Sequence, residues 1–566
     1  MLKATYLFAL LVAGALLAPL AWSQPHIAED GIVNAASYTP RGLPNSGIAR
    51  GSMFVIFGEG LGPESLVKVS SFPLPETLAG TSIQVTVGGT TVDCIMIYTS
   101  ALQVAAILPS RTPAGEGTLV LSYNGQKSNA VTIQVVERSF GIFTWNEQGN
   151  GPGIIQNFVN EALTPVNSLA ESAQPDQALI IWGTGLGPVA GDEAAGPLPG
   201  THDVDVEILL GNHRIKPLDR TRSGCCAAID QISFVVPRGL AGCFVPLAVR
   251  VGGVISNFVT IAIDPKGGVC SDPLSFSADE LSKYLDGESY SMGTVFLTRT
   301  NMRMPMGMMG PVQTDTTTDT AFASFVRYAG REIFQDPTFP PAPGSCVVST
   351  FTEKAEQKHI RVGEHVNVGH LLDAGPKLQL NGPKGAREMP RITRGAYSAL
   401  LGGGPTVGDG PTLEEYLEPG QYTVHNGDGG SDVGPFNASL KLPVLLEWTN
   451  RDKVEVVPRN QDLLITWSGG DPDQEYVIIA GTSNGDFHWK SGASFFCTAQ
   501  VQAGQFLVPA DVLSALPASG DSGGFPLGTL RVGGASYWKA NKFSAPGLDA
   551  GYFWYASSSA KNVTYQ

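Results

Sequence analysis

The chain has 566 residues and a formal net charge of −15 at pH 7, with 68 glycines, 40 prolines and only 15% charged residues. A chain of this length is too long to fold around a single hydrophobic core. Its glycine and proline content predicts many turns and few long helices. The negative charge and the lack of a basic run exclude a nucleic acid or an anionic membrane as partner. We therefore expect a mostly β protein of several domains.

The first 23 residues have the pattern of a secretory signal. Lys3 precedes an apolar run from Leu7 to Leu20, and Ala21 and Ser23 are the small residues that a signal peptidase requires. No later segment reaches the roughly 18 apolar residues of a membrane-spanning helix. The sequence predicts export to the extracellular space, the cell surface or the periplasm, without a transmembrane segment.

Two stretches of the first half occur twice. "GEGLGP", ending at Pro63, returns as "GTGLGP", ending at Pro188, and "SNAVTIQV" from Ser128 returns as "SNFVTIAI" from Ser256. Order and spacing are kept, which indicates a tandem duplication. Each copy contains short alternating apolar segments between turn residues, the pattern of an immunoglobulin-like sandwich. Proline follows the glycines at once, whereas a nucleotide-binding loop needs a helix there, so that interpretation is excluded.

A family resemblance is carried by the second copy. "GCCAAIDQISFVVPRGLAGCFVPLAVRVGGVISNFVTIAI" and the following "CSDP" resemble secreted acidobacterial proteins with the Solibacter uncharacterised C-terminal domain, which are similar to IPT/TIG immunoglobulin-like domains. The resemblance covers Gly31 to Pro273, and the first copy departs from it in having only Cys94. It implies export and an immunoglobulin-like fold, and it assigns no catalytic residues.

Disulfides are the expected state of cysteines in an exported chain. Four cysteines lie close together in the sequence: Cys225, Cys226, Cys243 and Cys270. We expect two bridges among them, with three pairings open and the vicinal pairing the least favoured. Cys346 can pair with Cys497, which leaves Cys94 buried and unpaired. Zinc is the alternative for the group of four, although no histidine lies at ligand spacing from it.

The second half begins with the clearest helix pattern, "SADELSKYLDG", in which Ser277 and Glu280 form a capping box. Strand patterns follow to the C-terminus. The expected organisation is a signal peptide (1–23), immunoglobulin-like repeats (24–137 and 138–270), a β-rich domain beginning with this helix (271–442) and a further sandwich-like domain (443–566).

Two serine motifs suggest a secreted hydrolase as an alternative. "GDSGG" surrounds Ser522 with the residues found around the nucleophile of chymotrypsin-like proteases, and "GTSNG" places Ser483 in a Gly-x-Ser-x-Gly motif. No histidine is followed by the cysteine typical of that protease family, and no helical pattern follows Ser483. A loop is the favoured interpretation of both motifs, and a non-catalytic protein is favoured over an enzyme.

Three further groups of side chains are binding candidates. Alternate methionines of an extended segment suit Cu(I): Met302, Met304, Met306 and Met308. Carboxylates of two acidic turns suit calcium: Asp428, Asp432, Asp471 and Asp473. Aromatic residues towards the C-terminus could form a flat surface that stacks on sugar rings: Trp489, Tyr537, Trp538, Phe553, Trp554 and Tyr555. Packing or an ordinary turn is the competing interpretation of each group.

The function that we predict from the sequence is non-catalytic binding outside the cell, in adhesion, matrix assembly or the capture of polysaccharide or cell-envelope components. The alternatives are a hydrolase with a C-terminal serine site and a periplasmic Cu(I)-binding protein.

Overall fold

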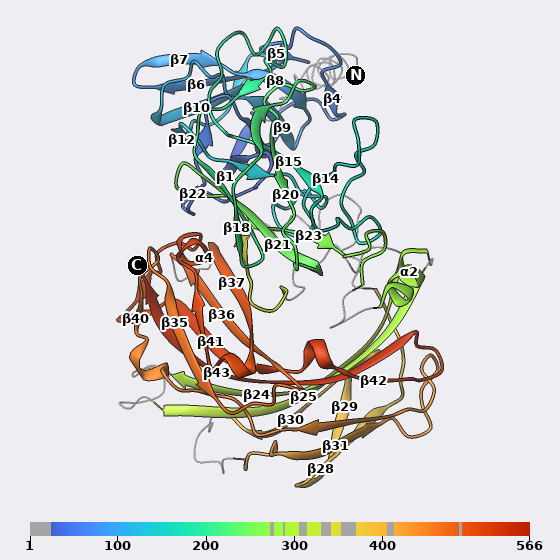
Figure 1. The fold of residues 1–566 in the computed structure, drawn as a ribbon. Helices are drawn as coiled ribbons and strands as arrows, with labels where there is room; N and C mark the ends of the chain where they lie inside the picture. The colour runs from blue at the N-terminus through green and yellow to red at the C-terminus, as the bar shows by residue number, and fades with distance from the viewer. Residues whose placement is uncertain are drawn as a thin grey trace, which may run out of the picture.

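The computed structural model describes residues 24–271, 277–286, 289–304, 314–329, 341–352, 369–404, 413–485 and 490–566. The expected signal segment, 1–23, lies outside these ranges. Strands dominate the described residues, so the predicted mostly β class is confirmed. Two immunoglobulin-like sandwiches lie on one side of a long curved sheet (Figure 1).

The first repeat is a sandwich of two sheets. One has the strand order β1 (His26–Asn34), β3 (Met53–Glu59), β9 (Gln103–Ile107), β8 (Ile95–Thr99), β4 (Val67–Lys68). The other has the order β2 (Ile48–Ala49), β12 (Val131–Val136), β10 (Gly115–Tyr123), β6 (Thr81–Val87), β5 (Thr77–Leu78), with β11 (Gln126–Lys127) and β7 (Thr90–Asp93) beside it. Alternate residues such as Ile83 and Val85 are fully buried between the sheets.

The second repeat has the same two-sheet architecture. One sheet has the order β13 (Gly141–Ile142), β15 (Ala178–Thr184), β20 (Asp230–Val235), β19 (Asp219–Arg222), β16 (Gly200–Thr201), with β14 (Ile155–Asn157) beside β15. The other has the order β18 (His213–Ile215), β17 (Val206–Leu210), β21 (Gly242–Val251), β22 (Val254–Ile255), with β23 (Val259–Ile263) beside β21. Ile181 and Phe234 are fully buried in its core.

One asparagine of each copy shows that the duplication is structural. The side chain of Asn129 accepts a hydrogen bond from the N–H of Ile27 (2.8 Å) and donates one to its carbonyl (3.0 Å). Asn257 makes the same pair of bonds with Ile142, at 2.8 and 2.9 Å. The repeated Ser-Asn dipeptide therefore fixes the same junction in both sandwiches.

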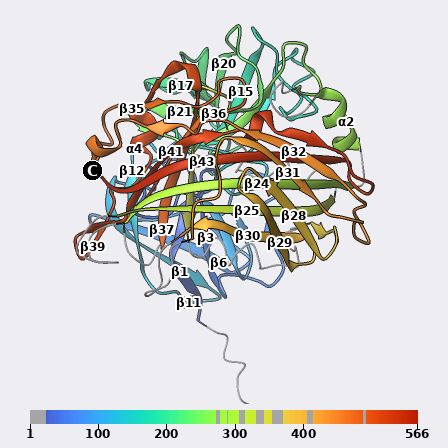
Figure 2. The ribbon, with the colours of Figure 1, turned by 90° about the horizontal axis from the view of Figure 1, so that it is seen from below.

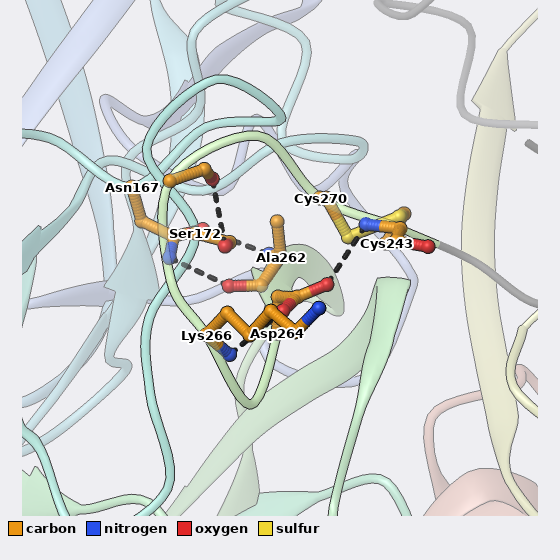
Figure 3. Close-up of a disulfide and its surroundings, with 9 residues drawn as sticks. Asn167, Ser172, Cys243, Ala262, Asp264, Lys266 and Cys270 are labelled. Atoms are coloured by element: carbon orange, nitrogen blue, oxygen red, sulfur yellow. Dashed lines mark hydrogen bonds between the residues drawn. A yellow bond between two sulfur atoms is a disulfide. The ribbon is translucent and has the colours of Figure 1, made fainter. Parts of the chain in front are cut away.

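The disulfide between Cys243 and Cys270 joins strand β21 to the segment after β23, with the Cα atoms 5.7 Å apart (Figure 3). Asp264 holds the turn before Cys270, because its carboxylate accepts hydrogen bonds from the N–H groups of Lys266 (2.8 Å) and Ser271 (2.9 Å). This bridge ties the end of the second repeat to its own sheet.

The rest of the chain is built on a 15-stranded sheet. Its order is β26 (Cys346–Thr352), β37 (Ser491–Gln500), β36 (Tyr476–Asn484), β41 (Gly528–Ala535), β43 (Ala550–Tyr565), β24 (Ser289–Met304), β25 (Thr314–Ala329), β30 (Ala396–Gly403), β29 (Gly385–Thr393), β28 (Lys377–Gly382), β31 (Gly420–His425), β32 (Asn437–Leu442), with β27 (His370–Leu371), β34 (Val456–Val457) and β42 (Asn541–Phe543) off this path. The last strand, β43, lies parallel to the first, β24, as Figure 2 shows. The boundary expected near Leu442 therefore separates no pair of sheets, because strands from both sides of it form this one.

Small elements surround this sheet. They are the three-stranded sheet β33 (Glu447–Trp448), β35 (Leu463–Ser468), β38 (Gln505–Val508), the hairpin β39 (Asp521–Ser522), β40 (Phe525–Pro526), helices α2 (Ala278–Asp286) and α4 (Ala510–Ser514), and 3-10 turns η3 (Arg451–Lys453), η4 (Val501–Ala503), η5 (Tyr537–Lys539). The capping box predicted for α2 is confirmed, since Ser277 Oγ accepts from the N–H of Glu280 and Glu280 Oε2 accepts from the N–H of Ser277. No helix of the described residues is long and apolar enough to span a lipid bilayer.

The second repeat packs directly against the long sheet. Ile255 and Phe258 belong to the same hydrophobic cluster as Val348 of β26. Beside this contact, Asp511 of α4 forms ion pairs with Arg214 (2.5 Å) and Arg250 (3.1 Å) of the repeat. The repeat and the sheet therefore share a buried interface.

Candidate functional site: an uncharged face of the long sheet

The three longest strands present one face that is only half-buried. We call it the hydroxyl–aromatic face, and it consists of alternate residues: Thr294, Phe296, Thr298, Thr300 and Met302 of β24; Thr316, Thr318, Thr320, Phe322 and Ser324 of β25; Tyr552, Trp554, Ala556 and Ser558 of β43. The residues between them, such as Val295, Ala323 and Phe553, are fully buried on the other side. Strand alternation thus separates a core side from an accessible side.

Four aromatic rings form a row across this face. Phe296 stacks on Trp554 with ring centroids 4.8 Å apart and an angle of 14° between the planes. Phe322 lies on the other side of Phe296 at 5.1 Å, and Tyr537 of η5 meets Trp554 edge-on at 5.5 Å. The strand register explains the row, because Phe296 stands directly beside both Phe322 and Trp554. The rings pack on one another, so they form an apolar ridge and not the flat surface expected from the sequence.

Hydroxyl groups occupy the rows next to the aromatic ridge. Thr298 stands beside Thr320, with hydroxyl oxygens 2.5 Å apart, and Thr300 stands beside Thr318. On the adjacent strand β30, Leu400 lies beside Thr320 and is 54% exposed. Strands lie about 4.8 Å apart, so these hydroxyls form regularly spaced rows.

No charged side chain of the three long strands lies on this face. Their six charged residues all occupy the opposite set of alternate positions: Arg299, Arg303, Asp315, Asp319, Arg327 and Lys561. Asp319 shows the reason, because its buried carboxylate is held by Arg299 at 2.7 Å and accepts the backbone N–H of Tyr416. Two cations of neighbouring strands border the face: Lys542 of β42 stands beside Tyr552, with its Nζ 6.0 Å from the centre of that ring, and Arg531 of β41 stands beside Ala560 at the other end.

The sequence found only part of this site. Of the six aromatics expected to form a surface, Trp554 and Tyr537 belong to the ridge, whereas Phe553 and Tyr555 are buried in the core and Trp538 is buried beside Tyr476. Trp489 lies outside the described residues. Sequence reasoning missed Phe296 and Phe322. The signal that could have identified them is threonine or serine recurring at alternate positions of both strands, in the same alternating set as Phe296 and Phe322.

Behind this face, Glu475 is buried against Tyr555. Its Oε2 accepts a hydrogen bond from the Tyr555 hydroxyl (2.9 Å) and its Oε1 accepts one from the N–H of Asp471 (3.0 Å). Burial raises the pKa of Glu475 to about 7, and burial next to this carboxylate also raises the pKa of Tyr555. Glu475 as a whole is 1% exposed and belongs to the core.

Neither candidate serine is arranged as a nucleophile. Ser483 lies inside strand β36, is fully buried, and donates its hydroxyl to the carbonyl of Pro517 (2.8 Å). Ser522 lies in the β39–β40 hairpin, where Asp521 accepts the N–H of Gly524 (2.9 Å). A triad needs a histidine hydrogen-bonded to the serine, and no such pair occurs in the described ranges. Both motifs are structural elements of β strands and turns.

The acidic turns use their carboxylates internally. Asp432 accepts hydrogen bonds from the N–H of Asp373 and from Arg394, each at 2.7 Å, and these contacts lower its pKa. Asp471 accepts the N–H of Asp473 (2.9 Å) and the side chain of Gln474. Asp428 is exposed. Within the described residues, no group of three or more His, Cys, Asp or Glu side chains is placed to hold a metal ion.

The methionine segment is only partly described. Met302 lies on the hydroxyl–aromatic face beside Thr316, and Met304 ends strand β24. Met306 and Met308 lie outside the described residues, so the copper hypothesis stays a prediction.

All cysteines except Cys94 are paired. Cys346 bonds to Cys497 across strands β26 and β37, and Cys225 bonds to its neighbour Cys226. The expectation that the vicinal pairing of Cys225 with Cys226 was the least favoured is therefore wrong. Once Cys243 is joined to Cys270, the remaining two cysteines share an exposed loop in which Ala228 has a φ of +58°.

No family profile and no curated protein sequence matches this chain. A tetra-tandem repeat from the extending region of a large adhesion protein is 11% identical over 94% of this chain and 98% of that one, with a TM-score of 0.14. Immunoglobulin domains 1–4 of Sidekick-1 are 10% identical over 94% and 99%, with a TM-score of 0.12. The Bacteroides ovatus mixed-linkage glucan utilization locus protein SGBP-B, in complex with a heptasaccharide, is 8% identical over 86% and 97%, with a TM-score of 0.14. Scores this low add nothing to what the strands of this chain show.

Proposed function

We propose that this is an exported, non-catalytic protein that binds a neutral polysaccharide on its hydroxyl–aromatic face. The observation that carries the proposal is a sheet face on which the three long strands place aromatic rings and hydroxyls but no charge, in a chain with a net charge of −15. Aromatic side chains cover the apolar faces of sugar rings, and threonine and serine hydroxyls exchange hydrogen bonds with sugar hydroxyls. An uncharged face in an acidic protein favours a neutral polymer over a charged one.

Three disulfides support export, because such bonds persist in oxidising compartments. Membership of the Solibacter C-terminal-domain proteins, as the second repeat suggests, is part of the same proposal. In this arrangement the docked repeats position the long sheet outside the cell, where adhesion, matrix assembly and polysaccharide capture take place.

The test is a pull-down of the full chain on insoluble neutral and anionic polysaccharides. We expect binding to a neutral polymer, and the Trp554→Ala and Phe296→Ala variants should each lose about tenfold in affinity. Replacing Thr298 and Thr320 by valine keeps their shape and removes only the hydroxyls, so it should weaken binding as well. The matched control is Leu507→Ala, which removes a 53% exposed side chain from a different sheet.

Salt provides an independent check. Because the three long strands place no charge on the face and its two bordering cations stand at its edges, affinity should change little between about 0.05 and 0.5 M salt. Binding that disappears at high salt, or that the Trp554→Ala and Leu507→Ala variants weaken equally, would show that the contact lies elsewhere. Failure of every neutral polysaccharide to bind would refute the proposed function.

A further inference from the structure

The vicinal disulfide lies at the joint between the two repeats. Cys225 and Cys226 are exposed, whereas the next two residues, Ala227 and Ala228, are 7% and 1% exposed. These alanines belong to a hydrophobic cluster with Leu74 and other residues of the first repeat. One short loop therefore carries both an accessible disulfide and part of a buried interface.

Hydrogen bonds connect this loop to the first repeat. The hydroxyl of Thr184 donates to the carbonyl of Ala228 (2.6 Å) and accepts the backbone N–H of Met53 in strand β3 (3.0 Å). The base of the loop is closed by the N–H of Ser223, which donates to the carbonyl of Ile229 (2.8 Å). A change in the loop backbone would therefore act directly on the contact with β3.

The two sulfur atoms have different surroundings. Ser223 Oγ lies 3.0 Å from Cys225 Sγ and also accepts the N–H of Cys225 (3.1 Å). A disulfide sulfur has no proton, so the serine hydroxyl is the donor in the contact with Sγ. The same hydroxyl would stabilise a thiolate formed on Cys225, and a stabilised thiolate leaves faster in disulfide exchange.

We propose that Cys225–Cys226 is a thiol–disulfide exchange site at which an external dithiol releases the joint between the repeats. A thiolate of the dithiol attacks Cys226 Sγ, the bond between the two cysteines breaks, and its electron pair stays on Cys225 Sγ. The second thiolate of the dithiol then displaces Cys226 from the mixed disulfide. Two electrons pass to the protein, the dithiol leaves as a disulfide, and both cysteines become thiols after taking up two protons.

The first test is limited reduction of the folded full chain with dithiothreitol, followed by alkylation and peptide mapping. We expect Cys225 and Cys226 to be labelled at least about tenfold faster than the two buried disulfides, because exchange requires access to sulfur. The internal controls are Cys243–Cys270 and Cys346–Cys497, in which no cysteine is more than 6% exposed, and the buried Cys94. Equal labelling of all three disulfides would overturn the assignment of this site.

The second test measures the joint itself by amide hydrogen exchange. In the selectively reduced protein, and in the Cys225→Ser/Cys226→Ser variant, exchange around Met53 and Ala228 should rise roughly tenfold as the joint opens more often. The control region is the pairing of Ile208 in β17 with Val249 in β21, which belongs to the other sheet of the second repeat and contributes no residue to the cluster at the joint. Unchanged exchange at Met53 in both proteins would refute release of the joint.

A third variant examines the leaving sulfur. Ser223→Ala should slow reduction by dithiothreitol roughly threefold to tenfold, because the thiolate on Cys225 loses its hydrogen-bond donor. Its thermal stability in the oxidised state serves as the control for folding. An unchanged reduction rate in a folded variant would contradict the role given to Ser223.

Discussion

In the tandem repeats and in the long sheet alike, each strand buries one face against a hydrophobic core. The two regions differ in how far apart in the sequence their neighbouring strands lie. In the repeats, each sandwich closes within its own copy of the duplicated sequence. In the long sheet, Phe296 of β24 stands beside Trp554 of β43, at opposite ends of the second half. The comparison teaches that alternation is sufficient to recognise a strand, whereas the neighbour of that strand depends on contacts distant in sequence.

The largest expected difference between the two regions concerns their disulfides. Cys346–Cys497 closes a loop of 151 residues in the long sheet, and Cys243–Cys270 closes one of 27 in the second repeat. Loop-closure entropy predicts that removing them by alanine substitution costs about 5 and about 3.5 kcal/mol respectively. Urea unfolding of both double variants tests this order, and a larger cost for the shorter loop would contradict it.

Consecutive residues of β43 sharpen the contrast between the two faces of the long sheet. Phe553→Ala removes a fully buried ring from the core and should lower the free energy of unfolding by about 4 kcal/mol. Trp554→Ala removes a half-buried ring from the accessible face and should cost no more than about 2 kcal/mol. Thermal and urea unfolding of the two variants measure the difference. Equal costs would mean that the accessible face is also core.

The buried carboxyl group of Glu475 predicts that the stability of the long sheet depends on pH. Its pKa is raised from 4.5 to about 7 in the folded protein, so between these values the folded state holds a proton that the unfolded chain releases. Stability is therefore lost as the pH rises from about 4.5 through 7, by up to about 3 kcal/mol. Glu475→Gln should remove this loss, so its advantage over the native chain grows with pH.

The control for this pH dependence is Asp473→Asn, which neutralises an exposed carboxylate nearby. It should leave the slope of stability against pH unchanged. If Glu475→Gln and the native chain show parallel profiles from pH 4 to about 8, the buried carboxyl group does not control stability.

The smallest expected effect compares the two copies of the repeat. Asn129→Ala removes two hydrogen bonds to Ile27, and Asn257→Ala removes two to Ile142 and a third to the carbonyl of Gly149. The costs should be about 2 and about 3 kcal/mol respectively, at roughly 1 kcal/mol for each bond. Amide hydrogen exchange of Ile27 and Ile142 measures the two junctions separately. If Asn257→Ala left the exchange of Ile142 unchanged, the two asparagines would not have equivalent roles.

Sequence patterns accounted for the repeats better than for the candidate site. The capping box of α2 could be identified because its hydrogen bonds join residues three apart, and the Ser-Asn dipeptides because the sequence repeats them at a constant offset. The long strands could also be recognised as strands. Their pairing could not be predicted, because any register that buries the alternate residues satisfies the same local pattern. The boundary placed near Leu442 failed for this reason, and Phe296 was not associated with Trp554.

The sequence by itself determined the β class, the duplication, the acidic charge and the number of cysteines available for pairing, since each follows from composition or from local order. The tertiary structure decided that Cys243 bonds to Cys270 and so leaves Cys225 to pair with Cys226, that Ser483 is buried, and that Thr298 and Trp554 share one face of the long sheet. These features depend on which distant segments meet. Strand pairing and burial fix those meetings through the free energy of the whole fold, which no single segment contains.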